Sequence, residues 1–402
     1  MAHGGDTASS DAYAFDEPSF ASSTPTVDRS PLREHLREWA PVYWAAALSR
    51  LLVLAVGFGA ELVMRRTGAD PAHWRPFAHA ETYPHYVDVA TNGYTLDNAV
   101  NHPVMPTLLA AGRALGVPFA ATGMIVSTIA FVAGLVLFAM LGERYVGRAA
   151  AVRAATYLAL APFAYWFSVT STESLMLLFV AGSALLAVRA TPASWLAAGA
   201  LGSLAVLTRP PGALVGLLLL AIAIAQLRER RLDRRGILAA VAAGLMLPVT
   251  LLGFFAYLRA RTGDPLASIH AQDGFHRHVS LGGPADAFTS ALRAVAAGSL
   301  GQAVELAATF GAAALLVWFA ASAAGRRWEI RGWTAFGAAS LVLPLMTGVL
   351  WQMPRFALLV PPVFWVLGTI GGRHRWLHAA AVTVCVSGLV VTVAASVVGV
   401  EG

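Results

Sequence analysis

The sequence predicts an all-α polytopic membrane protein with about eleven transmembrane helices. Of its 402 residues, 57% are hydrophobic and 12% are charged, whereas a typical soluble domain carries roughly 25% charged residues. Apolar runs of about 18 residues, long enough to cross about 30 Å of hydrocarbon as a helix, recur from Pro41 to the C-terminus. These two observations exclude a soluble globular fold.

The chain begins with a polar segment that has no lasting hydrophobic period. Residues 1–38 are rich in Ser, Ala, Pro, Thr and Asp, which is typical of disorder, and we expect a disordered cytoplasmic tail there. The first apolar run starts near Pro41, too far along the chain for a cleavable signal peptide. Residues 39–402 are therefore expected to form the transmembrane domain.

Apolar runs and polar segments alternate through this domain. The run 104–118 is predicted as an additional short helix, or as one that dips into the membrane and returns. Two polar segments, about 65–105 and 259–300, are predicted to be long loops. The expected transmembrane spans are 41–63, 119–141, 150–169, 172–189, 193–207, 211–226, 236–258, 302–322, 333–351, 354–371 and 376–399.

The orientation follows from the basic residues, which are all arginine. They cluster in short loops on one side of the predicted bundle, most densely at 228–235. By the positive-inside rule this side and the N-terminus are cytoplasmic, and both long loops lie on the outer side of a cell membrane. The net charge of +6 is thus explained by topology and does not indicate nucleic-acid binding. The single cysteine, Cys385, excludes an intramolecular disulfide.

The first outer loop is unusually polar for this chain. In this loop, carboxylates are close in sequence to aromatic residues, whose rings can pack on sugars or lipid headgroups. The histidines lack the spacing of a metal site, so no metal ligand set is predicted. Each residue alone fits a solvated loop, but together they mark the expected location of the chemistry. The residues are Glu81, Asp88, Asp97, Tyr83, Tyr86, Tyr94, His79, His85 and His102.

Further polar residues stand at the predicted outer ends of spans. Arg209 and Arg355 interrupt apolar runs, where a charge either has a partner or snorkels to the interface. Glu173 opens a span and is either a helix cap or a pocket residue. In the second outer loop, Arg259 is placed to hold either a lipid headgroup or a substrate phosphate. Asp264 belongs to a Thr-Gly-Asp-Pro turn.

Six stretches occur in the order of one family's motifs. They are Val89–Tyr94 (compare IAxxGY), Asn101–Pro106 (FFPLYP), Ala161–Leu178 (PxxFFLSxxYTESLFLL), Leu207–Gly212 (LTRPTG), Thr262–Ala267 (TGDPLAF) and Met353–Phe356 (MPRY). Together they resemble the PIG-V-like mannosyltransferase family of the GT-C glycosyltransferase superfamily. The resemblance implies a GT-C-like bundle that moves mannose, or a similar sugar, from a polyprenyl-phosphate donor to an acceptor outside the cytoplasm.

The resemblance also shows one departure. The family opens its first loop with Arg-Trp-Asp, whose aspartate is regarded as its catalytic or donor-site acid. That position falls on Thr82 here, and the tryptophan position falls on Glu81. Either Glu81 takes the role with a shift of one residue, or the site is altered. Asp88 is the next candidate for the catalytic base.

The remaining roles are implied by the resemblance together with the chemistry of sugar transfer. Arg209, Arg259 and Arg355 are expected to contact the donor phosphate, because its negative charge grows as it leaves. Glu173 and Asp264 would shape the pocket. His102 and Tyr94 are further candidates for substrate binding. No cofactor is required by the pattern, and a divalent cation is left open.

Partners and alternative functions follow from the same observations. The acceptor is a glycolipid, a protein or a polysaccharide, and membrane lipid surrounds the chain. One alternative is a catalytically altered member of the family that binds polyprenyl lipid or scaffolds another enzyme, because the expected aspartate is absent. A second alternative is a secondary transporter, although we find no internal repeat of the kind common in transporters.

Overall fold

The computed structural model describes residues 31–68, 74–75, 78–79, 83–275, 279–322 and 328–398. Its described part is helical except for β1 (Trp74–Arg75) and β2 (Ala78–His79), which form a two-residue antiparallel pair. An N-terminal unit that ends at Trp39 contains helix α1 (Pro31–Glu38). The rest of the predicted tail lies outside the described residues.

The chain is a multi-pass integral membrane protein. Within the described residues, six helical segments are long and apolar enough to cross a membrane. Three shorter apolar helices, α7 (Glu173–Ala187), α8 (Pro192–Val206) and α16 (Pro361–Gly371), accompany them. The long segments are α2 (Ala40–Arg66), α5 (Phe119–Val146), η2 (Pro210–Leu214) with α9 (Val215–Arg228), α10 (Arg234–Thr262), α13 (Leu300–Ala321) and α17 (Arg375–Val398).

Three predicted spans are not continuous helices, and proline explains the breaks. In the predicted span 150–169, helix α6 (Arg148–Leu160) ends before Pro162 and is followed by the 3-10 helix η1 (Ala164–Phe167). The span 333–351 contains α14 (Trp328–Leu345), which ends just after Pro344. The span 354–371 divides into α15 (Met353–Ala357) and α16, which begins at Pro361. Proline lacks the amide proton that a continuing helix needs.

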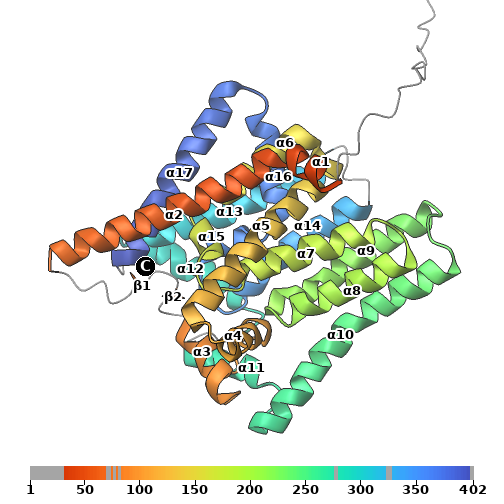
Figure 1. The fold of residues 1–402 in the computed structure, drawn as a ribbon, viewed down its shortest axis with the longest axis horizontal. Helices are drawn as coiled ribbons and strands as arrows, with labels where there is room; N and C mark the ends of the chain where they lie inside the picture. Colours follow the sequence, from red (N-terminus) through yellow and green to blue (C-terminus); the bar gives the residue numbers. More distant parts are fainter. Residues whose placement is uncertain are drawn as a thin grey trace, which may run out of the picture. The chain divides into compact units, whose positions relative to one another are not determined.

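Both predicted loops contain helices, and the second is largely helical. The first contains α3 (Tyr83–Asn92), and α4 (Val104–Ala114) follows it as the predicted extra short helix. The second contains α11 (Ala267–His270), η3 (Ala271–Phe275) and α12 (Gly283–Ala296). Figure 1 shows α3, α4 and α11 together at one end of the membrane domain, opposite the α9–α10 connection. We call these the carboxylate end and the arginine end.

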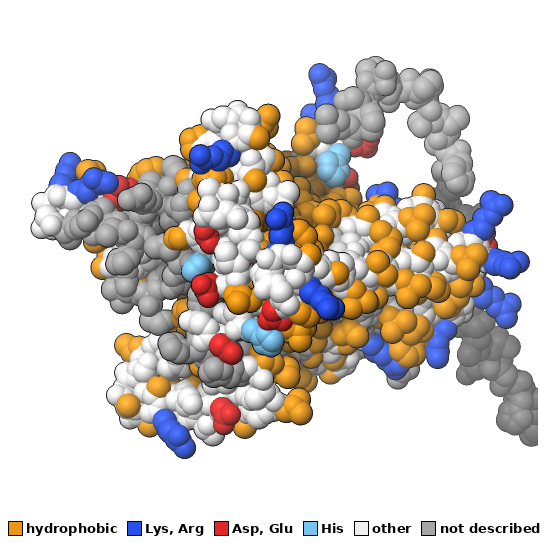
Figure 2. Space-filling model, turned by 90° about the horizontal axis from the view of Figure 1, so that it is seen from below, with side chains coloured by type: hydrophobic (Ala, Val, Ile, Leu, Met, Phe, Trp, Pro, Cys, Tyr) orange, Lys and Arg blue, Asp and Glu red, His pale blue; other side chains and the backbone are white. Residues whose placement is uncertain are grey.

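Charge is distributed unevenly between the two ends. On the face shown in Figure 2, most acidic side chains lie on one side of a broad hydrophobic band, with histidine and some basic side chains among them, and a dense group of basic side chains lies beyond its other edge. The arginines of the α9–α10 connection are exposed at 228, 230, 231, 234 and 235. This separation is the pattern expected of a bundle that spans a bilayer.

Small residues allow the helices of the core to approach closely. A Cβ atom on Gly199 of α8 would lie 2.7 Å from Cα of Ala243 on α10. A Cβ atom on Gly134 of α5 would lie 2.9 Å from the amide nitrogen of Leu178 on α7. Close backbone contact of this kind is a main source of helix association in membranes, where lipid removes the hydrophobic driving force.

A buried arginine holds the break after α6. Arg50 of α2 is 6% exposed and donates hydrogen bonds to the carbonyl oxygens of Ala164 (2.8 Å) and Ala159 (3.1 Å). It also donates to Ser168 Oγ at 2.7 Å, and its guanidinium lies 4.5 Å from the ring centroid of Phe131. The first membrane helix therefore supplies donors for carbonyl groups that the interrupted helix leaves unpaired.

Candidate functional site

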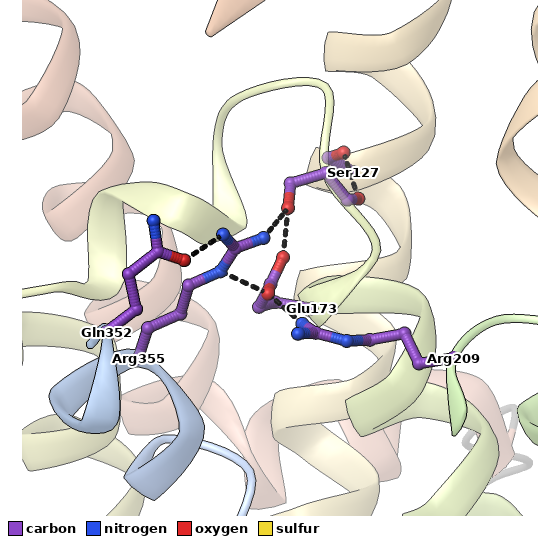
Figure 3. A network of polar contacts seen from close by, with 6 residues as sticks. Ser127, Glu173, Arg209, Gln352 and Arg355 are labelled. Atoms are coloured by element: carbon purple, nitrogen blue, oxygen red, sulfur yellow. Dashed lines mark hydrogen bonds and ion pairs between the residues drawn. The ribbon is translucent and has the colours of Figure 1, made fainter. Parts of the chain in front are cut away.

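Glu173 is the centre of a buried polar network at the start of α7. Its side chain is 0% exposed, and the preceding residue Thr172 occupies the N-cap position, so Glu173 is not the helix cap. Oε1 of Glu173 accepts hydrogen bonds from Nη1 of Arg209 and from Nε of Arg355, and Oε2 accepts one from Ser171 Oγ. Figure 3 shows the two guanidinium groups approaching Glu173 from opposite sides. We call Arg209, Glu173 and Arg355 the Arg–Glu–Arg cluster.

Arg209 is positioned by the connection between α8 and η2. Its backbone is extended, and Pro210 then starts the 3-10 helix η2. Gly212 lets η2 lie directly on the backbone of α8, because a Cβ atom there would lie 2.0 Å from the carbonyl oxygen of Ala205. The guanidinium lies 5.2 Å from the ring centroid of Phe356, next to Arg355 in the chain.

Arg355 is held from several sides within the short helix α15. Its Nη1 donates to Gln352 Oε1 at 2.8 Å, and its Nη2 donates to Ser171 Oγ at 3.1 Å. The guanidinium carbon lies 3.4 Å from the ring centroid of Trp166, which belongs to η1. A planar guanidinium fixed on one face by a ring and on its edge by acceptors has little freedom to reorient.

Glu305 of α13 holds the turn that carries Arg355. Its Oε1 accepts the backbone N–H of Gln352 at 2.9 Å, and its Oε2 accepts that of Met353 at 2.7 Å. Gln352 has a φ of 59°, a left-handed conformation that is costly for a residue other than glycine and that persists where surrounding contacts fix it. The carboxylate of Glu305 therefore stabilises the local geometry on which the position of Arg355 depends.

The Arg–Glu–Arg cluster has an excess of positive charge. Two guanidiniums share one carboxylate, and within the described residues Glu173 is the one carboxylate that pairs with either arginine. The arginine side chains are 14% and 6% exposed, so water screens this excess only weakly. An anion with several oxygen atoms is the complementary ligand, because guanidinium groups bind such oxygens with paired hydrogen bonds.

Two cavities meet at the cluster. The larger, about 790 Å³, lies among α13, α15, α16 and α17, is lined mostly by apolar side chains, and includes Arg355 and Glu305 in its wall. The smaller, about 350 Å³, is lined by Arg209, His102 and residues of α10 and α11. Trp351 lines both cavities. Each arginine of the cluster thus faces a different cavity.

His102 lies beside the smaller cavity, and Tyr94 does not line either cavity. His102 is 6% exposed, and its Nδ1 lies 2.8 Å from the carbonyl oxygen of Val206, so Nδ1 carries the proton. Burial lowers the pKa of His102 to about 4, so the ring is neutral at physiological pH. Tyr94 donates its hydroxyl proton to the carbonyl of Asn101 at 2.7 Å, and its ring packs edge-on against Phe254. Tyr94 is thus a packing residue beneath α3.

Asp88 braces the segment that follows α3. Its Oδ2 accepts a hydrogen bond from Asn98 at 2.6 Å, and its Oδ1 accepts one from Asn92 at 2.7 Å. These two amide donors, Asn98 first, lower the pKa of the Asp88 carboxyl below its ordinary value. Asp88 is therefore ionised at neutral pH and partly accessible, as a base must be, although both of its oxygens already have partners.

Among the described residues, two further candidates from the sequence, Asp264 and Arg259, make no hydrogen bond or ion pair with the cluster. Asp264 accepts the backbone N–H of Leu266 at 2.9 Å and pairs with Nδ1 of His270 at 2.6 Å, so it ties the turn before α11 to the end of that helix. These bonds, that from His270 first, lower the pKa of Asp264. Arg259 is exposed on the last turns of α10. Glu81 and Thr82 lie outside the described residues.

Four residues of the site were missed from the sequence. Glu305 had a usable signal, because a carboxylate inside an otherwise apolar run is costly and so is rarely without a role. Trp166 had none, since its contact with Arg355 joins segments far apart in the chain. Ser171 and Gln352 are close in the chain to Glu173 and Arg355 but are uncharged, so nothing marked them. Within the described residues, no group of three or more His, Cys, Asp and Glu side chains is arranged to hold a metal ion.

Part of this chain is similar to a family of sugar-transfer enzymes. A family model described as dolichyl-phosphate-mannose-protein mannosyltransferase matches residues 101–254. This range contains His102, Glu173 and Arg209 and ends before Arg355. The match is to this mannosyltransferase family and not to the PIG-V-like family that the motifs resemble. No curated protein sequence shows significant similarity to the chain.

Solved structures of an archaeal enzyme share the fold. Archaeal oligosaccharyltransferase AglB from Archaeoglobus fulgidus, in complex with an inhibitory peptide and a dolichol-phosphate, has a TM-score of 0.52 and 13% identity, over 90% of this chain and 56% of that chain. The A. fulgidus enzyme tethered to an acceptor peptide has a TM-score of 0.52 and 11% identity, with the same coverage. The chain thus has the helical fold of the region that it matches, and it spans little more than half the length of those proteins.

Proposed function

We propose that the chain is a membrane glycosyltransferase that moves a sugar, with mannose as the first candidate, from a polyprenyl-phosphate donor to an acceptor. The observation that carries this proposal is the Arg–Glu–Arg cluster, whose positive excess lies at the head of a large apolar cavity. The matched mannosyltransferase family and the shared fold of an enzyme solved with dolichol-phosphate support the same class of donor.

The larger cavity fits the donor in both of its parts. A polyprenyl chain is apolar and needs a groove open to lipid, and the cavity is lined by apolar residues of α13 and α17, two of the membrane-spanning helices. A phosphate needs cationic donors at the end of that groove, and Arg355 supplies one. The smaller cavity, with Arg209 and neutral His102, then receives the acceptor hydroxyl beside the sugar.

The reaction needs few groups. The bond between the anomeric carbon and the phosphate oxygen breaks, and the acceptor oxygen bonds to the same carbon while a carboxylate takes its proton. Arg355 and Arg209 stabilise the phosphate as its negative charge grows. Glu173 is bonded to both arginines and so acts as a positioning residue, not as the base. The base in this proposal is Glu81 or Asp88.

Several finer features belong to the same proposal. Eleven segments would cross the membrane, counting α6 with η1 and α15 with α16 as one crossing each. The carboxylate end would face away from the cytoplasm, because the exposed arginines of 228–235 lie at the other end. Kinship with PIG-V-like enzymes rests on the six motif stretches. The acceptor class stays open among glycolipid, protein and polysaccharide.

A transfer assay tests the proposal directly. Membranes containing the protein are incubated with radiolabelled polyprenyl-phosphate mannose, and label is measured in lipid, protein and polysaccharide fractions. Arg355→Gln is expected to abolish transfer, while Arg113→Gln, which removes an exposed charge from α4, should leave it unchanged. Glu81→Gln and Asp88→Asn identify the base, because only the variant that lacks it loses transfer at normal expression. Full transfer by Arg355→Gln would refute the assigned phosphate contact.

Cys385 provides a separate test of where the donor binds. It lies in the wall of the larger cavity and is the single cysteine of the chain. Polyprenyl phosphate is therefore expected to slow its modification by a small apolar maleimide. Protection by the lipid without transfer of label to any acceptor would favour the second candidate function, a lipid-binding or scaffolding member of the family, which the threonine at position 82 makes a real alternative.

A further inference from the structure

A second concentration of positive charge lies at the arginine end, outside the Arg–Glu–Arg cluster and its two cavities. A hollow of about 420 Å³ there is lined by three arginines, Arg148, Arg153 and Arg373, together with Gly147 and Gly372. We call it the arginine hollow. It belongs to the arginine end because α5, which ends at Val146, is tied to the start of α14 by the ion pair of Arg144 and Glu329 (2.8 Å). Beside Glu329, the ring centroid of Trp328 lies 4.9 Å from the guanidinium carbon of Arg228 at the end of α9.

The fold places the guanidinium groups specifically. Arg153 donates from Nε to the carbonyl oxygen of Gly368 at 2.8 Å. Gly372 makes room for this side chain, because a Cβ atom there would lie 2.2 Å from Nη2 of Arg153. Arg373, the next residue, lies with its guanidinium 5.1 Å from the ring centroid of Trp318. The arginines come from α6 and from the α16–α17 connection, so the hollow exists only in the folded protein.

Among the residues that the structure describes, basic groups outnumber acidic groups around the hollow. The one carboxylate paired there within the described residues is Glu143, whose Oε1 lies 3.7 Å from Nη1 of Arg148 and whose side chain is 41% exposed. Within that part of the chain, three arginines stand against one paired glutamate, an excess of two positive charges. The N-terminus of α6 also opens here, with Gly147 at a φ of 76° and no side-chain cap. Its amide groups add further partial positive charge.

The hollow lies at the depth of lipid headgroups. Four helices meet there: α5 and α16 end at Val146 and Gly371, and α6 and α17 begin at Arg148 and Arg375. Trp376 at the start of α17 is 66% exposed. An exposed tryptophan at the end of an apolar helix is typical of the boundary between hydrocarbon and headgroups. Among the described residues, no aromatic ring lines the hollow to stack on a nucleobase.

We propose that the arginine hollow binds the phosphate group of an anionic membrane lipid. Phosphate oxygens accept hydrogen bonds from guanidinium groups in pairs, and basic pockets between membrane helices on the arginine-rich side suit such headgroups. A zwitterionic lipid should bind more weakly, because its ammonium group is repelled by the arginines of the hollow. This site is separate from the proposed sugar transfer and does not depend on it.

The test compares lipids and variants on the full-length protein in detergent. Native mass spectrometry measures retained lipid after addition of phosphatidylglycerol or phosphatidylcholine, and inorganic phosphate is the third probe. The variant Arg148→Gln/Arg373→Gln removes two charges from the hollow and keeps Arg153, whose bond to Gly368 supports the fold. The matched control Arg189→Gln/Arg234→Gln removes two exposed charges from the same end outside the hollow.

The wild type is expected to retain phosphatidylglycerol in preference to phosphatidylcholine. This preference should fall at least tenfold in the hollow variant and should persist in the control variant. Equal retention of phosphatidylglycerol by the hollow variant and the wild type would overturn the proposal. A similar loss in both double variants would also overturn it, because it would show a general charge effect. Retention of inorganic phosphate by the wild type without retention of either lipid would overturn the proposal and reassign the site to a free anion.

Discussion

Replacing Arg209 by glutamine separates the structural role of the Arg–Glu–Arg cluster from its proposed chemical role. In the wild type two guanidiniums share the buried carboxylate of Glu173. In Arg209→Gln the carboxylate keeps Arg355 and Ser171, so the remaining group is a neutral pair. In Glu173→Gln, by contrast, two guanidiniums lose their shared counter-charge. The first variant should fold well and work poorly, whereas the second should also be unstable.

The magnitudes follow from the burial of the groups. Removing one partner of a buried ion pair costs about 3–5 kcal/mol, and we expect a loss in this range for Glu173→Gln. Arg209→Gln loses one charge-assisted hydrogen bond, which is worth about 1.5–3 kcal/mol. Part of this loss is offset because the repulsion between the two arginines disappears and because Arg209 is partly hydrated, with 14% of its side chain exposed. We therefore expect a net loss of about 1 kcal/mol.

The assay measures both quantities on the same preparations. Chemical denaturation in detergent gives the change in the free energy of unfolding, and the radiolabelled donor gives the rate of sugar transfer. For Arg209→Gln we expect a rate about 100- to 1,000-fold lower, the usual effect of removing one donor that stabilises developing negative charge. Arg113→Gln serves as the control for a lost surface charge.

Two results would refute this reasoning. If Arg209→Gln destabilises the protein as much as Glu173→Gln does, the cluster acts as one structural unit and carries no functional excess of charge. If Arg209→Gln transfers sugar at the wild-type rate, Arg209 is not a phosphate contact, whatever its effect on stability.

Three further predictions concern groups around the site. In the folded protein His102 has a pKa of about 4, against an ordinary value of 6.5. Its protonation therefore opposes folding, and the free energy of unfolding is expected to fall by about 3 kcal/mol as the pH drops from 6.5 towards 4. His102→Asn, which keeps a donor for Val206 but cannot titrate, should flatten this part of the curve of unfolding free energy against pH, and an unchanged curve would contradict the assignment. Asp88 has a lowered pKa, so its hydrogen bonds to Asn92 and Asn98 stay intact at neutral pH and weaken only as the pH falls below the ordinary carboxyl pKa of about 4. Asp88→Asn should speed amide hydrogen exchange over residues 93–101. Exchange at the wild-type rate would count against the bracing role. Glu305→Gln removes the charged acceptors of the backbone amides of Gln352 and Met353 and should lower the free energy of unfolding by about 1.5–3 kcal/mol. It should also slow sugar transfer more than a substitution outside the site that destabilises the protein equally.

The membrane class and most helices could be predicted from the sequence, because hydrophobic length is a local property. The six long segments begin within two residues of their predicted starts, including α5 at Phe119 and α17 at Arg375. Prediction failed where proline divides an apolar run, as after Leu160 and before Pro361. Composition stays apolar across such breaks, so the hydrophobic signal alone does not show them.

The site could be predicted in part, because a charged residue within an apolar run is also a local signal in the sequence. Glu173, Arg209 and Arg355 each stand out as charges in apolar surroundings, and the structure brings all three together. Arg259 and Asp264 were singled out in the polar segment 259–300, and there they satisfy solvent or local contacts. Which charges converge depends on helix packing between segments up to 182 positions apart, and no local pattern encodes that.

The contact of Arg50 with the broken end of α6 has a consequence for biogenesis. Helix α2 leaves the ribosome more than a hundred residues before Ala159 and Ala164, the carbonyl partners of Arg50. Until they arrive, its arginine stands in an apolar helix, which costs about 2.5–3.5 kcal/mol on the scale of translocon insertion. The first helix is thus expected to wait at the translocon, or beside a chaperone, until α6 is made. Replacing Arg50 by leucine would ease its insertion and leave the later break without its donors.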